Sequence, residues 1–179
     1  MINSRQIEID IHHKSKSWQN ISQINRKINE IILKIIKKTE IAKFLKNQNN
    51  KIELSIILAN DSQIRQINKS HLNKDKPTNV LSFPAFDVNS KNKLNFLSLS
   101  KSQNYIFLGD IILSLETIRK EVANSNYKSF YGHLTHLLLH SILHLLGYDH
   151  LQDKEAQEME NLEIQILKSL NIKNPYDNH

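Results

Sequence analysis

The stretch FYGHLTHLLLHSILHLLGYDH, residues 130–150, joins an apolar helical stripe to a cluster of histidines. Leucines at positions 134, 137, 138 and 145 recur at helical spacing. Gly147 is well suited to end such a helix in the left-handed conformation. The stretch therefore predicts an amphipathic helix over Phe130–Leu146, followed by a tight turn.

Three histidines of this stretch have the spacing of a metal site. His140 and His144 are four residues apart, so their side chains project from one helix face, one turn apart. If the chain turns back at Gly147, His150 approaches the same point. Three protein ligands plus water is the pattern of an open, catalytic zinc site, and the sequence has no cysteine to act as a ligand. We predict one metal ion, and Zn²⁺ is preferred over nickel or copper because it is more available.

Two further histidines on the same helix, His133 and His136, are not predicted to be ligands. His136 and His144 are eight residues apart, about 12 Å along a straight helix at 1.5 Å per residue, which is too far for one ion. His136 could still hydrogen-bond to a ligand, but we favour a partly buried core position for it and for His133.

The rest of the chain predicts four short strands among several helices. Gly109 lies inside an apolar strand, which indicates a β-bulge or the close approach of another group. Without regular alternation of strands and helices, the pattern favours an α+β fold in which a small mixed four-stranded sheet packs with several helices. The expected strands are Gln6–His12, Ile52–Ala59, Val80–Phe83 and Tyr105–Ser114; the expected helices, besides the histidine helix, are Ile21–Leu45 (long or broken), Asp61–His71, Leu115–Asn124 and Asp153–Leu170; Lys74–Asn79 and residues 87–103 are expected to be loops.

Composition sets the class of protein. A chain of 179 residues with 39% hydrophobic residues can bury one core, so residues 1–179 are predicted to be a single domain. No apolar leader and no run of about 18 apolar residues is visible, so we expect a cytoplasmic protein with no membrane partner. The net charge of +6 suits RNA, although A/T-rich codons for lysine, asparagine and isoleucine explain it as well.

Three motifs in order resemble the YbeY family of bacterial endoribonucleases, also called rRNA maturation factors. Residues 140–150 resemble the family's H-G-x-L-H-L-x-G-Y-D-H, with Ser141 in place of the glycine. Residues 75–84, DKPTNVLSFP, resemble D-K-P-T-D/N-V-L-S-F-P, and residues 108–111 resemble L-G-D-I. With Met159 and Glu160 the resemblance covers about residues 50–170, and the first 45 residues match only in general character.

The resemblance implies a single-strand-specific, metal-dependent endoribonuclease that acts in late rRNA processing, at the 3′ end of 16S rRNA, and in ribosome quality control. Its partners would be single-stranded rRNA and the ribosome or small-subunit proteins. His140, His144 and His150 would hold Zn²⁺ and act through a metal-activated water, although attack by the RNA's own 2′-hydroxyl stays open. Residues expected to support the ligands or contact RNA are Lys74, Lys76, Thr78, Asn79, Ser82, Asp110 and Asp149.

One departure from the family pattern leaves a second function open. Counted back from Asp75 without a gap, Leu72 falls where the family usually has arginine, so either the loop is shifted or the arginine's role is missing. Leucine cannot donate to phosphate, and Lys74 and Lys76 are candidate substitutes. The alternative is therefore a metal-binding ribosome-assembly factor that does not cleave RNA. A metallopeptidase is disfavoured, because Ser141 occupies the position where such enzymes carry a glutamate base.

Overall fold

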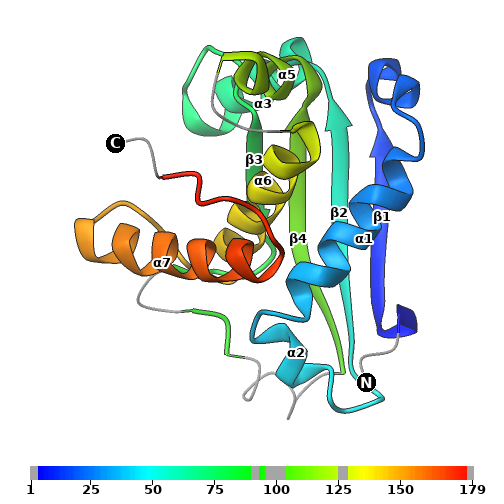
Figure 1. Cartoon of the computed structure of the whole chain (residues 1–179), viewed down its shortest axis with the longest axis vertical. Coiled ribbons are helices and arrows are strands. Elements are labelled where there is room, and N and C mark those ends of the chain that lie inside the picture. Colours follow the sequence, from blue (N-terminus) through cyan, green and yellow to red (C-terminus); the bar gives the residue numbers. More distant parts are fainter. Residues whose placement is uncertain (1–3, 90–92, 96–103, 125–128, 177–179) are drawn as a thin grey trace.

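The protein is built on a four-stranded mixed sheet. The computed structural model describes residues 4–89, 93–95, 104–124 and 129–176. Within these residues the strands are β1 (Ile7–His13), β2 (Lys51–Ala59), β3 (Val80–Pro84) and β4 (Tyr105–Ser114). Their order across the sheet is β1-β2-β4-β3, with β1, β2 and β4 parallel and β3 antiparallel to β4 (Figure 1). The predicted α+β class with a mixed four-stranded sheet is confirmed.

The helices follow the predicted pattern, with one break. The segment 21–45 forms two helices, because a turn at residues 37–40 separates them and the Thr39 hydroxyl there donates to the Ile36 carbonyl at 3.0 Å. In the described residues no helix has the length and apolar character needed to cross a membrane. The helices are α1 (Ile24–Ile36), α2 (Ile41–Phe44), α3 (Asp61–Leu72), α5 (Leu115–Asn124), α6 (Phe130–Leu145) and α7 (Asp153–Ser169), with 3₁₀ turns at Ser4–Gln6 and Lys16–Asn20.

Each face of the sheet is covered by different helices. Alternate β2 side chains from Ile52 to Leu58 belong to the main core with α1 and α6, whereas Ile57 and Ala59 pack on the other face with Ile64 of α3. Figure 1 shows α1 and α6 lying across the same face of the sheet. Because α6 is packed between the sheet and its neighbouring helices, the helix that carries the histidines is held by the core.

Gly109 in β4 explains how the edge strand β3 approaches. Its φ is +137°, and a Cβ there would lie 2.2 Å from the Phe83 carbonyl oxygen. The pairing of β2 with β4 also shifts register between Glu53 and Ser55. The predicted bulge and close approach at this glycine are both confirmed.

The segment expected to be a surface loop, residues 87–103, is described only in part. Residues 90–92 and 96–103 lie outside the described residues. Leu94 is buried, and its N–H donates to the Leu146 carbonyl at 2.9 Å. The expectation of a surface position was wrong for Leu94, because this residue covers the end of α6.

Candidate metal centre

A tight turn at the end of α6 brings the third histidine to the other two. Gly147, with φ +91°, donates its N–H to the His144 carbonyl at 2.9 Å, and the Tyr148 N–H donates to the Leu143 carbonyl at 3.0 Å. These two bonds form a Schellman motif, in which a left-handed residue ends the helix. The predicted left-handed glycine is confirmed, and the turn directs His150 back toward His140.

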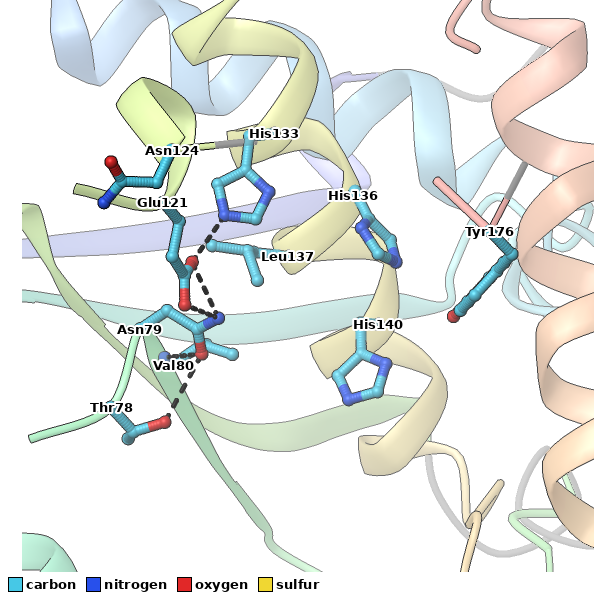
Figure 2. A pocket seen from close by; sticks show the side chains of 10 residues that line it. All are labelled: Thr78, Asn79, Val80, Glu121, Asn124, His133, His136, Leu137, His140 and Tyr176. Carbon is cyan, nitrogen blue, oxygen red and sulfur yellow. Dashed lines mark hydrogen bonds and ion pairs between the residues drawn. The ribbon is translucent and has the colours of Figure 1, made fainter. Parts of the chain in front are cut away.

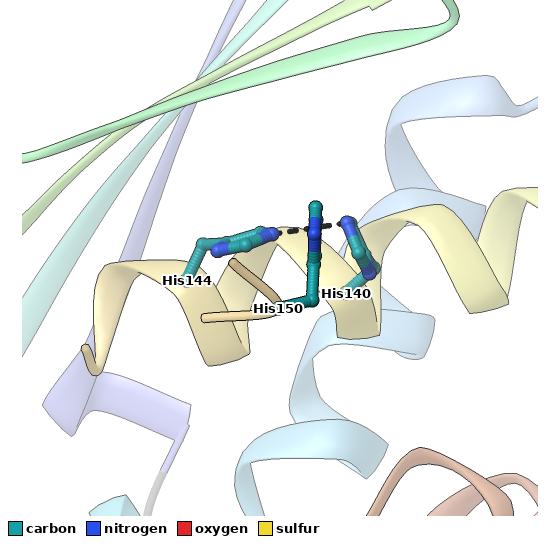
Figure 3. A group of neighbouring side chains, drawn as sticks. All are labelled: His140, His144 and His150. Atoms are coloured by element: carbon teal, nitrogen blue, oxygen red, sulfur yellow. Dashed lines mark hydrogen bonds between the residues drawn. The ribbon is translucent and has the colours of Figure 1, made fainter. Parts of the chain in front are cut away.

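His140, His144 and His150 form one cluster (Figure 3). One ligand nitrogen from each lies within 4.8 Å of the others, and the Nε2 atoms of His140 and His144 are 3.0 Å apart. Zn–N bonds of about 2.0–2.1 Å in a tetrahedral site place pairs of nitrogens roughly 3.3 Å apart. The His140–His144 spacing is therefore close to that of two ligands on one ion, and His150 lies near enough to be a third.

Hydrogen bonds at the far side of two rings orient the cluster. His140 Nδ1 donates to Glu163 Oε1 at 2.8 Å, and His144 Nδ1 donates to the Tyr148 carbonyl at 2.9 Å. A carboxylate and a carbonyl can only accept, so Nδ1 carries a proton in each ring, and when the two imidazoles are neutral both Nε2 atoms present lone pairs. Two lone pairs facing each other at 3.0 Å repel unless a cation lies between them. The donor set and its orientation thus fit a metal ion.

The protonation of these groups agrees with metal binding. Burial, together with the neighbouring His140 and His150, lowers the pKa of His144 to about 4, so its imidazole is neutral at physiological pH. Burial alone would raise the pKa of Glu163, but hydrogen bonds from His136 and His140 outweigh it and lower that pKa to about 2. A metal ligand must be a neutral imidazole, and an ionised carboxylate behind it increases its basicity.

Glu163 is the centre of a second cluster behind the first. Its side chain is fully buried, and its Oε2 accepts from His136 Nε2 at 3.4 Å and from the Tyr176 hydroxyl. His136, His140 and Glu163 also offer ligand atoms within 4.8 Å of one another. Because His140 already directs Nε2 to the first cluster and Nδ1–H to Glu163, we assign this second group to hydrogen bonding that supports His140. His136 is thus a partly buried residue that bonds to the carboxylate behind a ligand.

Comparisons with known proteins agree with this geometry. A family model described as Endoribonuclease YbeY matches residues 10–171. The chain belongs to the YbeY endoribonuclease family. A relative from Agrobacterium fabrum named Endoribonuclease YbeY is 38% identical over 173 residues, which is 95% of each chain. A second with this name, from Bartonella bacilliformis, is 51% identical over 125 residues, 69% of this chain and 72% of its own.

A solved structure supports the same fold. The solution structure of TM1509 from Thermotoga maritima superposes with a TM-score of 0.51 at 22% identity and covers 90% of this chain and 88% of that one. The family match that begins at residue 10 also includes most of the N-terminal 45 residues. Those 45 residues contain none of the three motifs and had matched the family only in general character.

The YbeY motif DKPTNVLSFP and the histidine cluster line a groove of about 770 Å³. Leu72, on which the YbeY arginine falls in an ungapped count from Asp75, lines the same groove and is 48% exposed. Arg65 lies on the same helix, but it forms an ion pair with Asp75 at 2.7 Å. The sequence-predicted residues that line the groove are Lys74, Lys76, Thr78, Asn79, Ser82, His140, His144, Asp149 and His150.

Hydrogen bonds to Glu121 and Val80 hold the Asn79 side chain in place. Its Nδ2 donates to both oxygens of Glu121 at 3.0 Å, and its Oδ1 accepts from the Val80 N–H at 2.7 Å. Glu121 also accepts from the buried His133 Nε2 at 2.6 Å. His133, predicted to be a core residue, is therefore buried and fixes the motif loop through Glu121.

The two aspartates predicted to support the ligands lie in different places. Asp149 Oδ1 accepts from the backbone N–H of His150 at 2.8 Å, so it shapes the turn that carries this ligand. Asp110 lies in β4, paired with Ser55 and Phe83, and is not among the described residues that line the groove. Glu163 holds the His140 imidazole instead.

Sequence reasoning missed Glu163, although the sequence contains a signal for it. Met159, Glu163 and Ile166 fall at helical spacing on the buried face of α7. A charged residue on an apolar stripe is almost never fully buried unless it is paired. Such a glutamate near a histidine cluster is a candidate partner for a ligand imidazole.

Proposed function

We propose that this chain is a zinc-dependent endoribonuclease that hydrolyses single-stranded RNA at the His140, His144 and His150 centre. The observation that carries the proposal is the convergence of three imidazoles, with the Nε2 atoms of His140 and His144 3.0 Å apart. Membership in the YbeY family supports RNA as the substrate. A bound Zn²⁺ would activate a water and stabilise negative charge on the phosphate.

The chain's own residues position the ligands and the RNA. Glu163 and the Tyr148 carbonyl hold two imidazoles by their Nδ1–H groups, so both rings keep one tautomer and one orientation. Lys74 and Lys76 line the opposite side of the groove, where their charges can neutralise phosphates. The RNA backbone would therefore lie between the lysines and the histidines.

We further propose that the substrate is rRNA, at the 3′ end of 16S rRNA, and that the protein works in the cytoplasm with the ribosome or small-subunit proteins in ribosome quality control. The ordered YbeY motifs at residues 75–84, 108–111 and 140–150 support this assignment. The net charge of +6 is compatible with an RNA partner.

The test is a cleavage assay with purified protein of known metal content. Single-stranded rRNA fragments are incubated with the wild type, with His144→Ala and with a chelated sample. Cleavage by the wild type alone, restored to the chelated sample by Zn²⁺, is the expected result. Products that end in a 2′,3′-cyclic phosphate would indicate attack by the RNA 2′-hydroxyl rather than by water.

A second candidate, a metal-binding assembly factor that does not cleave RNA, is favoured by Leu72. An exposed leucine lines the groove at the usual position of the family's arginine. If bound metal is measured but no sample cleaves RNA, and Leu72→Arg stays inactive, this candidate replaces the first. Association with ribosomal subunits in a sedimentation assay would then be the next measurement.

A further inference from the structure

A second pocket opens beside the metal centre (Figure 2). Its volume is about 600 Å³, within the roughly 300–1,000 Å³ typical of small-ligand sites. Figure 2 shows Glu121 and Asn124 on one side of it and His136, His140 and Tyr176 on the other. We call it the side pocket, because it shares part of its lining with the groove: Thr78, Asn79, Val80, Glu121 and His140.

One wall of the side pocket carries the carboxylate of Glu121. The Glu121 side chain is 37% exposed. Burial would raise its pKa, but the hydrogen bonds from His133 and Asn79 outweigh burial and lower it, so the carboxylate is ionised. Like charges repel, so a phosphate is disfavoured here, whereas Lys74 and Lys76 line the groove outside this pocket. The part of an RNA that suits the side pocket is a base.

The hydrogen bonds that Glu121 already accepts restrict which base can bind in the side pocket. A carboxylate accepts about four hydrogen bonds. Three are already made, two from Asn79 and one from His133. Roughly one acceptor position is left for a single N–H donor. An exocyclic amine on adenine, cytosine or guanine supplies one, whereas the N–H of uracil lies between two carbonyl oxygens that a carboxylate repels.

The remaining walls suit the faces of a base. The rings of His136 and Tyr176 lie 5.9 Å apart between centroids, and the apolar side chains of Val80 and Leu137 complete the lining. Aromatic and apolar side chains are the surfaces on which unstacked RNA bases pack. Tyr176 comes from the segment that follows α7, so this segment forms one wall of the pocket.

We propose that the side pocket binds one nucleobase with an exocyclic amino group, from a nucleotide next to the scissile phosphate, and so gives the nuclease a base preference. This inference rests on the proposed function. Glu121 accepts a hydrogen bond from the amine, the Asn124 amide adds a polar contact, and His136 and Tyr176 pack against the ring.

The experiment uses short single-stranded RNAs that differ at one position at a time, with each of the four bases or an abasic residue. Cleavage is measured as kcat/KM, and binding is measured by fluorescence anisotropy with chelated protein, in which cleavage is off. At one position near the cut, amine-bearing bases should be preferred over uracil by about tenfold, as expected for one hydrogen bond to a charged group. Glu121→Gln should reduce this preference to about twofold, and Asn124→Ala should weaken it.

The matched control is Glu116→Gln on the same helix, because Glu116 accepts from the Asp61 N–H, outside the pocket. This variant should keep the preference. If circular dichroism shows that Glu121→Gln does not fold, the preference measured with Asn124→Ala tests the proposal, because Asn124 is exposed.

The outcomes separate this proposal from the nuclease function. Equal cleavage and equal binding of all bases at every position would overturn the proposed base binding in the side pocket, but not the proposed nuclease function. A base preference that survives both variants also overturns it. If no RNA is cleaved but the chelated protein still binds amine-bearing bases preferentially through Glu121, the proposed nuclease function is wrong and the proposed base binding is supported.

Discussion

The two walls of the groove are built in different ways. On the α6 wall, His140 and His144 each make a hydrogen bond at Nδ1 that fixes the ring before any ligand arrives. On the opposite wall, Lys74 and Lys76 are exposed, and Leu72 replaces the guanidinium expected there. The histidine wall is therefore preorganised for the proposed metal ion, whereas the proposed RNA binding would rely on exposed lysines. Changes on the first wall should therefore have larger effects.

The largest effect should come from His144→Ala. This change removes one of three ligands and leaves a site that cannot hold the ion with the same geometry. Metal content by mass spectrometry and rRNA cleavage should both fall to the detection limit. Retention of one equivalent of zinc with full cleavage would contradict the site.

Glu163→Gln should rank second. Loss of the charge behind His140 should lower zinc affinity by about 10- to 100-fold, as measured by competition with a chromophoric chelator. Glu160→Gln on the exposed side of the same helix is the control and should leave affinity unchanged. Equal affinity of both variants would reduce Glu163 to a packing role.

Gly147→Ala should lower stability by about 1–3 kcal/mol, because φ is +91° and the new Cβ would lie 3.0 Å from Lys93 Cα. The free energy of unfolding is measured in urea. Gly132→Ala serves as control, since its Cβ would meet only Ser129 Oγ, at 3.1 Å. A wild-type value for the Gly147 variant would show that the turn tolerates a side chain.

Leu72→Arg tests the wall opposite α6, which carries Lys74 and Lys76. A guanidinium at this exposed position can bind phosphate in a bidentate manner, so kcat/KM for RNA cleavage should rise, by up to about tenfold. Leu72→Gln separates charge from polarity and should change little. An unchanged rate with arginine would mean that the lysines already supply the contact.

The smallest effect should come from Lys76→Gln. Loss of one phosphate contact should weaken RNA binding a few-fold and reduce the slope of log affinity against log salt by about 0.7. Anisotropy titrations at several salt concentrations measure both quantities. Lys51→Gln, an exposed lysine of β2 that does not line the groove, is the control.

Local patterns account for what the sequence could predict. The helix, its glycine turn and the three ligands lie within about 20 residues of one another, so spacing alone brings them together. The bulge at Gly109 was likewise visible as a glycine inside an apolar strand. The strands and most helices were predicted to within a few residues, because each has a clear apolar period.

Contacts between distant segments account for what could not be predicted. Glu163 lies 23 residues from His140, and its role depends on how α7 packs against α6. The bond from Asn79 to Glu121 spans 42 residues and depends on the pairing of β3 with β4. No periodicity in the sequence sets these distances, because tertiary packing brings the partners together.

The turn at Gly147 links the end of α6 to the proposed metal centre through a single residue, Tyr148. Tyr148 donates its N–H to Leu143, and its carbonyl accepts from the His144 ring. A metal ion on Nε2 would add a further restraint to this ring and so tighten the last helical turn. Amide hydrogen exchange at Gly147 and Tyr148 should be faster in metal-free protein, so occupancy of the site can be followed there without any RNA.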